Sequence, residues 1–157
     1  SMRKDNLCEQ IIRKNSDMVY KLAYSLVRTR ADADDVYQEV FLRYVRKLPE
    51  FSSAEHEKAW FLRVTINCCK NLWKSPWRQR MVELREDAEF TEMESDDISL
   101  IDTVKQLPEK YRIVIHLFYY EGLSVEEIGK ITKSRASTVR TRLTRARKLL
   151  RKELGGI

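Results

Sequence analysis

LSVEEIGKITKSRASTVRTRLTRARKLLRK, residues 123–152, is the stretch that decides the fold of the C-terminal part of this chain. It holds two segments with apolar residues at helical spacing, joined by a short polar turn. In the second segment Val139, Leu143, Ala146 and Leu150 share one helical face, while residues 133–152 contain nine lysines and arginines and no acid. The pattern predicts a helix-turn-helix whose basic second helix lies in the DNA major groove.

The opposite face of the basic helix carries cations and hydroxyls that can bond to phosphates and base edges. A charge run alone is equally consistent with a solvated helix that has no nucleic-acid partner. The first segment favours DNA binding, because Ser124 and Glu127 form a capping box at its start and Ser134 or Ser137 can cap the second helix. The side chains that we expect on the DNA-facing side are Arg140, Thr141, Thr144, Arg145 and Lys148.

Charge is unevenly distributed along the 157 residues. Residues 83–97 contain eight acids and one arginine, whereas the blocks before and after them carry net charges of +6 and +7. A run of like charges with few apolar residues does not pack, so we expect residues 75–97 to be an acidic flexible linker. The chain length allows two small domains, one on each side of this linker.

Several classes of protein are not supported by the composition. The sequence has no apolar run long enough for a membrane span and no signal peptide, so we expect a cytoplasmic protein. Cys8, Cys68 and Cys69 are odd in number and lack CxxC spacing, which favours reduced thiols over a disulfide or metal framework. A zinc site formed with His56 and His116 is the weaker alternative. No acid pair or phosphate loop indicates an enzyme, and we expect no metal and no cofactor.

Helical periodicity runs through the rest of the chain, and no segment shows sustained strand alternation. A polar loop is expected at residues 50–57, and Gly122 is expected to cap a helix at its C-terminus. The expected helices lie around residues 7–12, from residues 15–17 to about 27, over residues 32–48, from residue 58 to about 73, from residue 98 onward, and over residues 109–121.

Three segments resemble one known family. Residues 32–48 read DADDVYQEVFLRYVRKL, residues 57–74 read EKAWFLRVTINCCKNLWK, and residues 107–150 contain the helix-turn-helix. In this order and spacing they resemble an extracytoplasmic-function (ECF) sigma factor, the smallest class of the sigma-70 family. The resemblance covers nearly the whole chain. It implies an all-α fold with a sigma-2 four-helix bundle at residues 2–74 and a sigma-4 helix-turn-helix bundle at residues 98–155, joined by the acidic linker.

The resemblance implies a transcription initiation factor without enzymatic chemistry. Such a protein binds core RNA polymerase, directs it to promoters through their −35 and −10 elements, and assists melting of the −10 region. Its partners would be the clamp coiled coil of the polymerase largest subunit, the flap of the second subunit, promoter DNA and an anti-sigma factor that can hold it at the membrane. No small-molecule substrate is implied. A stand-alone helix-turn-helix regulator and a nucleic-acid enzyme are the alternatives.

Candidate site residues also follow from the resemblance. In the −10 reader, an unstacked base would be read by side-chain amides and a stacking surface, while cations hold the phosphates. The basic helix of residues 133–152 would read the −35 element. The polymerase-docking residues would be Asp35, Gln38, Glu39 and Leu42, and the −10 residues would be Phe51, Ser52, Ser53, His56, Arg63, Asn67, Lys70 and Asn71.

The turn of the helix-turn-helix departs from the family's pattern. Thr132 and Lys133 stand where Leu-Gly is usual, and Ser137 stands where glycine is usual. Glycine adopts a positive φ at little steric cost, whereas other residues do not. This turn must therefore avoid a positive φ or adopt one at some cost in stability.

Overall fold

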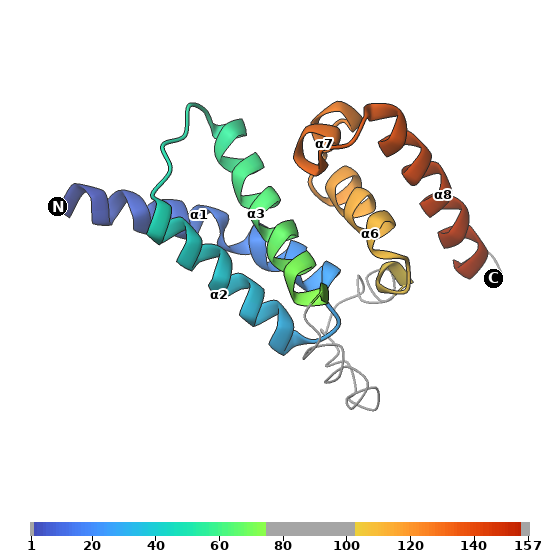
Figure 1. The fold of residues 1–157 in the computed structure, drawn as a ribbon, viewed down its shortest axis with the longest axis horizontal. Coiled ribbons are helices and arrows are strands. Elements are labelled where there is room, and N and C mark those ends of the chain that lie inside the picture. The colour runs from blue at the N-terminus through green and yellow to red at the C-terminus, as the bar shows by residue number, and fades with distance from the viewer. Residues whose placement is uncertain (1, 75–102, 155–157) are drawn as a thin grey trace. The chain divides into compact units, whose positions relative to one another are not determined.

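The computed structural model of the protein describes residues 2–74 and 103–154. The chain divides into two compact units, Ser1–Thr91 and Glu92–Ile157 (Figure 1). Every regular element within the described residues is helical, which agrees with the predicted all-α fold. The acidic linker predicted at residues 75–97, and the start of the helix predicted from Ile98, lie outside the described residues.

Helix α1 spans Met2–Leu26 as one continuous helix. The predicted break at residues 15–17 is therefore wrong, and residues 2–74 contain three helices rather than four. Asn15 and Ser16 do not cap a new helix, because their side chains donate to carbonyl oxygens one turn earlier, those of Ile11 (2.9 Å) and Ile12 (2.6 Å). Bonding back along the helix satisfies these polar groups without ending it.

Helix α2 spans Arg30–Lys47, and Thr29 caps its N-terminus. The hydroxyl of Thr29 accepts a hydrogen bond from the backbone N–H of Asp32 at 3.1 Å. It ends at Leu48, which adopts a left-handed conformation with φ 42° just before Pro49. A non-glycine residue in this conformation carries a steric cost. The sharp end turns the chain into the loop that leads to the third helix.

Helix α3, Ala54–Lys74, starts earlier than predicted, because residues 54–57 are helical rather than part of a loop. Ser53 supplies the cap that the sequence reading missed. Its hydroxyl accepts from the backbone N–H of His56 at 3.0 Å, and its carbonyl accepts from the N–H of Glu57 at 3.1 Å. The loop therefore shortens to residues 48–53.

The three helices pack pairwise against one another around an apolar and aromatic core. Phe61 lies at its centre, with ring centroids 5.4 Å from Tyr44 and 5.6 Å from Phe41. Burial of apolar surface on this scale is the main stabilising contribution to a small helical unit. The fully buried side chains around it include Val19, Leu22, Leu26, Val27, Val40 and Leu62.

The second unit begins, within the described residues, with a short helical segment at residues 103–105 and with α6, Glu109–Ile115. The predicted helix over residues 109–121 does not stay α-helical. It continues as a π-helical turn, η1, His116–Tyr120, in which the N–H of Glu121 bonds to the carbonyl of His116. Gly122 then has φ +66°, which fits its predicted role as a cap.

Helices α7, Val125–Thr132, and α8, Ala136–Leu154, form the predicted helix-turn-helix and pack against each other. The capping box is present in both directions: Glu127 N–H donates to Ser124 Oγ at 3.1 Å, and Ser124 N–H donates to Glu127 Oε1 at 3.0 Å. Lys133 ends α7 with φ 55°, so the turn adopts the positive φ without glycine. Ser137, one of the two predicted caps of α8, lies inside that helix.

No helix among the described residues is both long enough and apolar enough to cross a membrane. No three His, Cys, Asp or Glu side chains in that part of the chain are grouped as metal ligands would be. Burial raises the pKa of the Cys68 thiol to about 11, partly offset by Arg43, so this thiol stays protonated at neutral pH.

Candidate functional site

The outer face of α2 carries the four side chains predicted to dock on a protein partner. Asp35 and Gln38 are exposed, and Leu42 is 47% exposed although it is apolar. Glu39 is half-buried and pairs with Arg43 one turn later at 3.1 Å. The face thus combines acceptor groups with exposed apolar surface, as in a protein–protein interface with a polar rim.

The sequence reading missed one apolar side chain that extends this surface. Val45 is about half exposed and lies three residues after Leu42 on the same side of α2. The i, i+3 spacing from Leu42 indicates that Val45 lies on the same face. The sequence did not predict its exposure, because apolar residues in an amphipathic helix are expected in the core.

The loop before α3 is closed by a bond to His56. The N–H of Ser52 donates to His56 Nδ1 at 3.1 Å, and the hydroxyl of Ser52 lies 3.3 Å from the same nitrogen. Because Nδ1 accepts the backbone bond, the neutral ring carries its proton on Nε2. His56 is exposed, so it presents Nε2–H to the outside as a hydrogen-bond donor.

Phe51 is held in an aromatic cluster instead of standing free at the surface. Its ring lies 6.4 Å from Tyr44 in a stacked arrangement, 5.9 Å from Trp60 and 5.4 Å from His56. Phe51 and Trp60 are half-buried, so each keeps part of its ring accessible. The loop residues Phe51, Ser52 and Ser53 and the first turn of α3 therefore form one connected group.

The other four predicted −10 residues continue along α3. Arg63, Asn67, Lys70 and Asn71 follow His56 at intervals of seven, eleven, fourteen and fifteen residues, which places them along one side of the helix. Asn67 and Asn71 are exposed, and Arg63 and Lys70 are half-buried. The Nε atom of Arg63 is buried and has no hydrogen-bond partner among the described residues.

Helix α8 displays its candidate residues on a regular exposed face. Its opposite side is buried at Val139, Leu143 and Ala146, while Leu150 is half-buried. The hydroxyls of Thr141 and Thr144 donate to the backbone one turn earlier, which leaves their oxygens as acceptors. All five side chains predicted to face DNA are exposed: Arg140, Thr141, Thr144, Arg145 and Lys148.

Three arginines of α8 make contacts inside the second unit. Arg140 pairs with Glu126 of α7 at 3.2 Å, an exposed ion pair that contributes little to stability. Arg147 donates from Nε to the hydroxyl of Tyr119 at 2.6 Å and lies over its ring, and Arg142 contacts Ser134 at 3.4 Å. Arg142 and Arg147 are half-buried, so both take part in packing.

Comparison with known proteins identifies both units. The family model of sigma-70 region 2 matches residues 11–79, and that of sigma-70 region 4 matches residues 97–150. The chain is 32% identical to the ECF RNA polymerase sigma factor SigE of Mycolicibacterium smegmatis over 91% of this chain and 60% of that protein. It is 31% identical to the RNA polymerase sigma factor SigV of Bacillus subtilis, over 86% of this chain and 83% of SigV.

Solved structures share the fold. The sigma factor RpoE of Bartonella quintana, solved in complex with the anti-sigma factor NepR, has a TM-score of 0.71 at 23% identity over 94% of this chain and 96% of that chain. CnrH, solved in complex with the cytosolic domain of CnrY, has the same TM-score and identity over 97% of this chain and 90% of that chain. At this level of identity the likeness extends to the fold alone.

Proposed function

Since the chain belongs to the ECF sigma factors of the sigma-70 family, which direct promoter-specific transcription initiation, we propose how its two units divide that work. The unit formed by α1, α2 and α3 holds core RNA polymerase and reads the −10 element. The unit that contains α7 and α8 reads the −35 element and contacts the polymerase flap. Residues 75–97 join the two as an acidic linker.

The docking role of α2 is supported by the composition of its outer face. Asp35, Gln38 and Glu39 offer carboxylate and amide groups beside the exposed Leu42. Val45 adds apolar surface next to them. The partner in this proposal is the clamp coiled coil, and exposed apolar side chains beside acceptor groups suit a small interface of this kind.

The −10 role is supported by the way donors and ring surfaces meet at the start of α3. A splayed base is recognised by stacking and by hydrogen bonds to its edges. Phe51 and Trp60 offer partly exposed rings, and His56 offers one outward donor. Further along the helix Asn67 and Asn71 offer amides, while Arg63 and Lys70 suit phosphates.

The −35 role rests most directly on the exposed face of α8. The five predicted side chains of α8 are exposed together, opposite a buried stripe, on the second helix of a helix-turn-helix. Such a helix can enter a major groove while its other face keeps the unit folded. Arg140 and Arg145 suit guanine edges or phosphates, and Thr141 and Thr144 suit base edges or phosphates.

We extend the proposal to regulation and location. RpoE of Bartonella quintana was solved bound to an anti-sigma factor, and we infer that this chain also has such a partner, which can hold it at the membrane. Because core polymerase and promoter DNA are cytoplasmic, the chain acts there. It supplies binding energy and no covalent chemistry, so it is not an enzyme.

Co-elution with core polymerase tests the docking role. The double variant Gln38→Ala/Glu39→Ala is expected to weaken core binding at least tenfold, measured by size exclusion and by titration with labelled protein. The matched control is Glu9→Ala/Gln10→Ala on α1, because Glu9 pairs with Arg13 at i, i+4 just as Glu39 pairs with Arg43. Equal binding by both double variants would remove the docking face from α2.

Transcription from a template pool randomised over the promoter region tests the reading roles. Wild-type protein with core polymerase is expected to select two separated sequence elements. A stand-alone regulator would give a different result. The chain alone would bind duplex DNA with an affinity similar to that of its complex with core polymerase, and adding core would not select a second element.

A further inference from the structure

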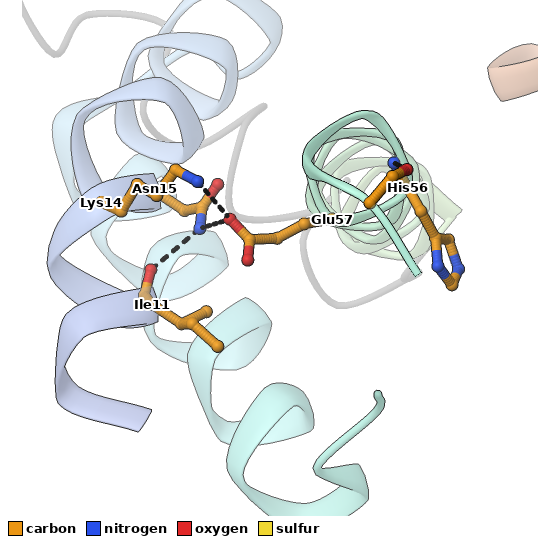
Figure 2. Close-up of polar contacts among 6 residues, drawn as sticks. Ile11, Lys14, Asn15, His56 and Glu57 are labelled. Atoms are coloured by element: carbon orange, nitrogen blue, oxygen red, sulfur yellow. Dashed lines mark hydrogen bonds and ion pairs between the residues drawn. The ribbon is translucent and has the colours of Figure 1, made fainter. Parts of the chain in front are cut away.

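A polar contact joins α1 to the first turn of α3 in the first unit (Figure 2). Asn15 is only 4% exposed. Its Nδ2 donates to the carbonyl of Ile11 at 2.9 Å and to Oε2 of Glu57 at 3.2 Å. Lys14 Nζ lies 3.3 Å from the same carboxylate oxygen, and the Glu57 side chain is only 12% exposed.

The Asn15 bond is the part of this cluster that fixes geometry. Lys14 is 63% exposed, and an ion pair with an exposed partner contributes little. Asn15 occupies a position on the buried side of α1 where Val19 and Leu22 are apolar. A buried polar pair at such a position favours one alignment of the two helices, since any other leaves the groups without partners.

Glu57 is tied in turn to the loop that carries the −10 candidates. Its N–H donates to the carbonyl of Ser53, and the neighbouring N–H of His56 donates to the hydroxyl of Ser53 at 3.0 Å. The His56 ring then accepts from the N–H of Ser52. Figure 2 shows Glu57 directed toward α1 while His56 points away from it.

We propose that Glu57, held by Asn15, is a positioning residue for promoter specificity. By fixing the first turn of α3 it keeps His56 in the orientation that directs Nε2–H outward as a single donor. The ligand of that donor is an unstacked base that offers an acceptor, such as a ring nitrogen or a carbonyl oxygen. The inference rests on the proposed −10 role of this loop and names the residues that make the loop selective.

The experiment uses the full chain with core polymerase and a template pool randomised at the −35 and −10 regions, followed by sequencing of the transcripts. Glu57→Ala is expected to reduce the preference at one −10 position roughly fivefold, the effect of a single misplaced hydrogen bond. Glu57→Gln is expected to keep the preference, because its amide oxygen still accepts from Asn15. The matched control is Glu55→Ala, an exposed acid in the same turn, which is expected to change nothing.

Asn15→Leu is the second variant, because leucine suits the apolar side of α1 and keeps the unit folded even if Glu57→Ala does not. It is expected to reduce the same preference while −35 selection is unchanged. His56→Ala separates the two proposals. If His56→Ala alters no −10 preference, the proposed −10 role of the loop fails. If His56→Ala removes a preference that folded Asn15→Leu and Glu57→Ala both retain, the positioning role is overturned.

Discussion

The two proposed DNA-reading surfaces are built in different ways. On α8 the five candidate side chains project from one regular helix, and the helix packs through the opposite face. At α3 the candidates come from a loop and a helix, and they are held by contacts with one another and with α1. The first surface suits the regular groove of a duplex, whereas the second suits an unstacked base that must be met from several sides.

This difference has consequences for substitution. A helix face presents each side chain independently, so removing one exposed residue on α8 removes one contact. The candidate residues at α3 contact one another. A substitution at Phe51 or Glu57 is therefore expected to shift neighbouring side chains that were not substituted. Both surfaces depend on the backbone that positions their side chains. The largest losses of stability are therefore expected from substitutions that force the backbone to move.

The largest effect is expected from Gly129→Ala in α7. A Cβ at Gly129 would lie 2.6 Å from the carbonyl oxygen of Ser134, a backbone atom that cannot move without disturbing the turn. We expect a loss of about 3 kcal/mol in the stability of the second unit. Hydrogen exchange of the amides of α7 and α8 measures it. All three tryptophans lie in residues 1–91, so an unchanged tryptophan transition shows that the first unit is intact.

Gly122→Ala is the matched control for this prediction. Nothing lies within 4 Å of a Cβ there, but its φ of +66° makes alanine unfavourable. We expect a loss of only about 1 kcal/mol. Equal losses at the two glycines would mean that crowding at Ser134 does not limit the turn.

Phe51→Ala is expected to have the next largest effect, on the first unit. The ring contacts Tyr44, Trp60 and Phe61, and removing a half-buried ring is expected to cost about 2 kcal/mol, below the range for a fully buried phenylalanine. Thermal unfolding followed by tryptophan fluorescence measures the loss. Phe118→Ala in the second unit is the control, and it should leave that fluorescence transition unchanged.

Arg145→Ala is expected to have a smaller and more selective effect. The side chain is exposed on α8, so its removal should leave stability unchanged while transcription from the preferred −35 sequence falls about tenfold relative to other sequences. Arg151→Ala removes another exposed cation, from the last turns of α8, and should weaken transcription from all templates slightly and equally. A uniform loss with Arg145→Ala would indicate a phosphate contact instead of base reading.

The smallest effect is expected from Lys133→Gly, and it is stabilising. Lys133 has φ 55°, a conformation that glycine adopts without the steric cost of a Cβ. We expect a gain of about 1 kcal/mol in the second unit, measured by hydrogen exchange. Lys130→Gly, inside α7, is the control and should destabilise by a similar amount. A loss of stability in Lys133→Gly would show that the lysine side chain stabilises the unit by more than its positive φ destabilises it.

The regular parts of the fold could be predicted because helical periodicity is a local property. The buried stripe of α8 and the capping box of α7 depend on residues within a few turns of one another, and both were predicted correctly. The break predicted at Asn15 was wrong, because its amide donates back to the carbonyl of Ile11 instead of capping a new helix. The same amide also donates to Glu57, 42 residues away, and local preference cannot anticipate that second partner.

By itself, the sequence determined that this protein is helical, that its C-terminal part ends in a basic helix-turn-helix, and that it resembles the ECF sigma factors. These conclusions depend on spacing and composition within short segments. Only the tertiary structure decided that α1 is unbroken, that Lys133 adopts a positive φ, and that Ser52 sets the tautomer of His56. Asn15 of α1 also bonds to Glu57 of α3, whereas the other two features are backbone geometries of a short turn and a loop. Residue spacing and composition do not specify them, because hydrogen-bond partners and steric limits are fixed only in the folded backbone.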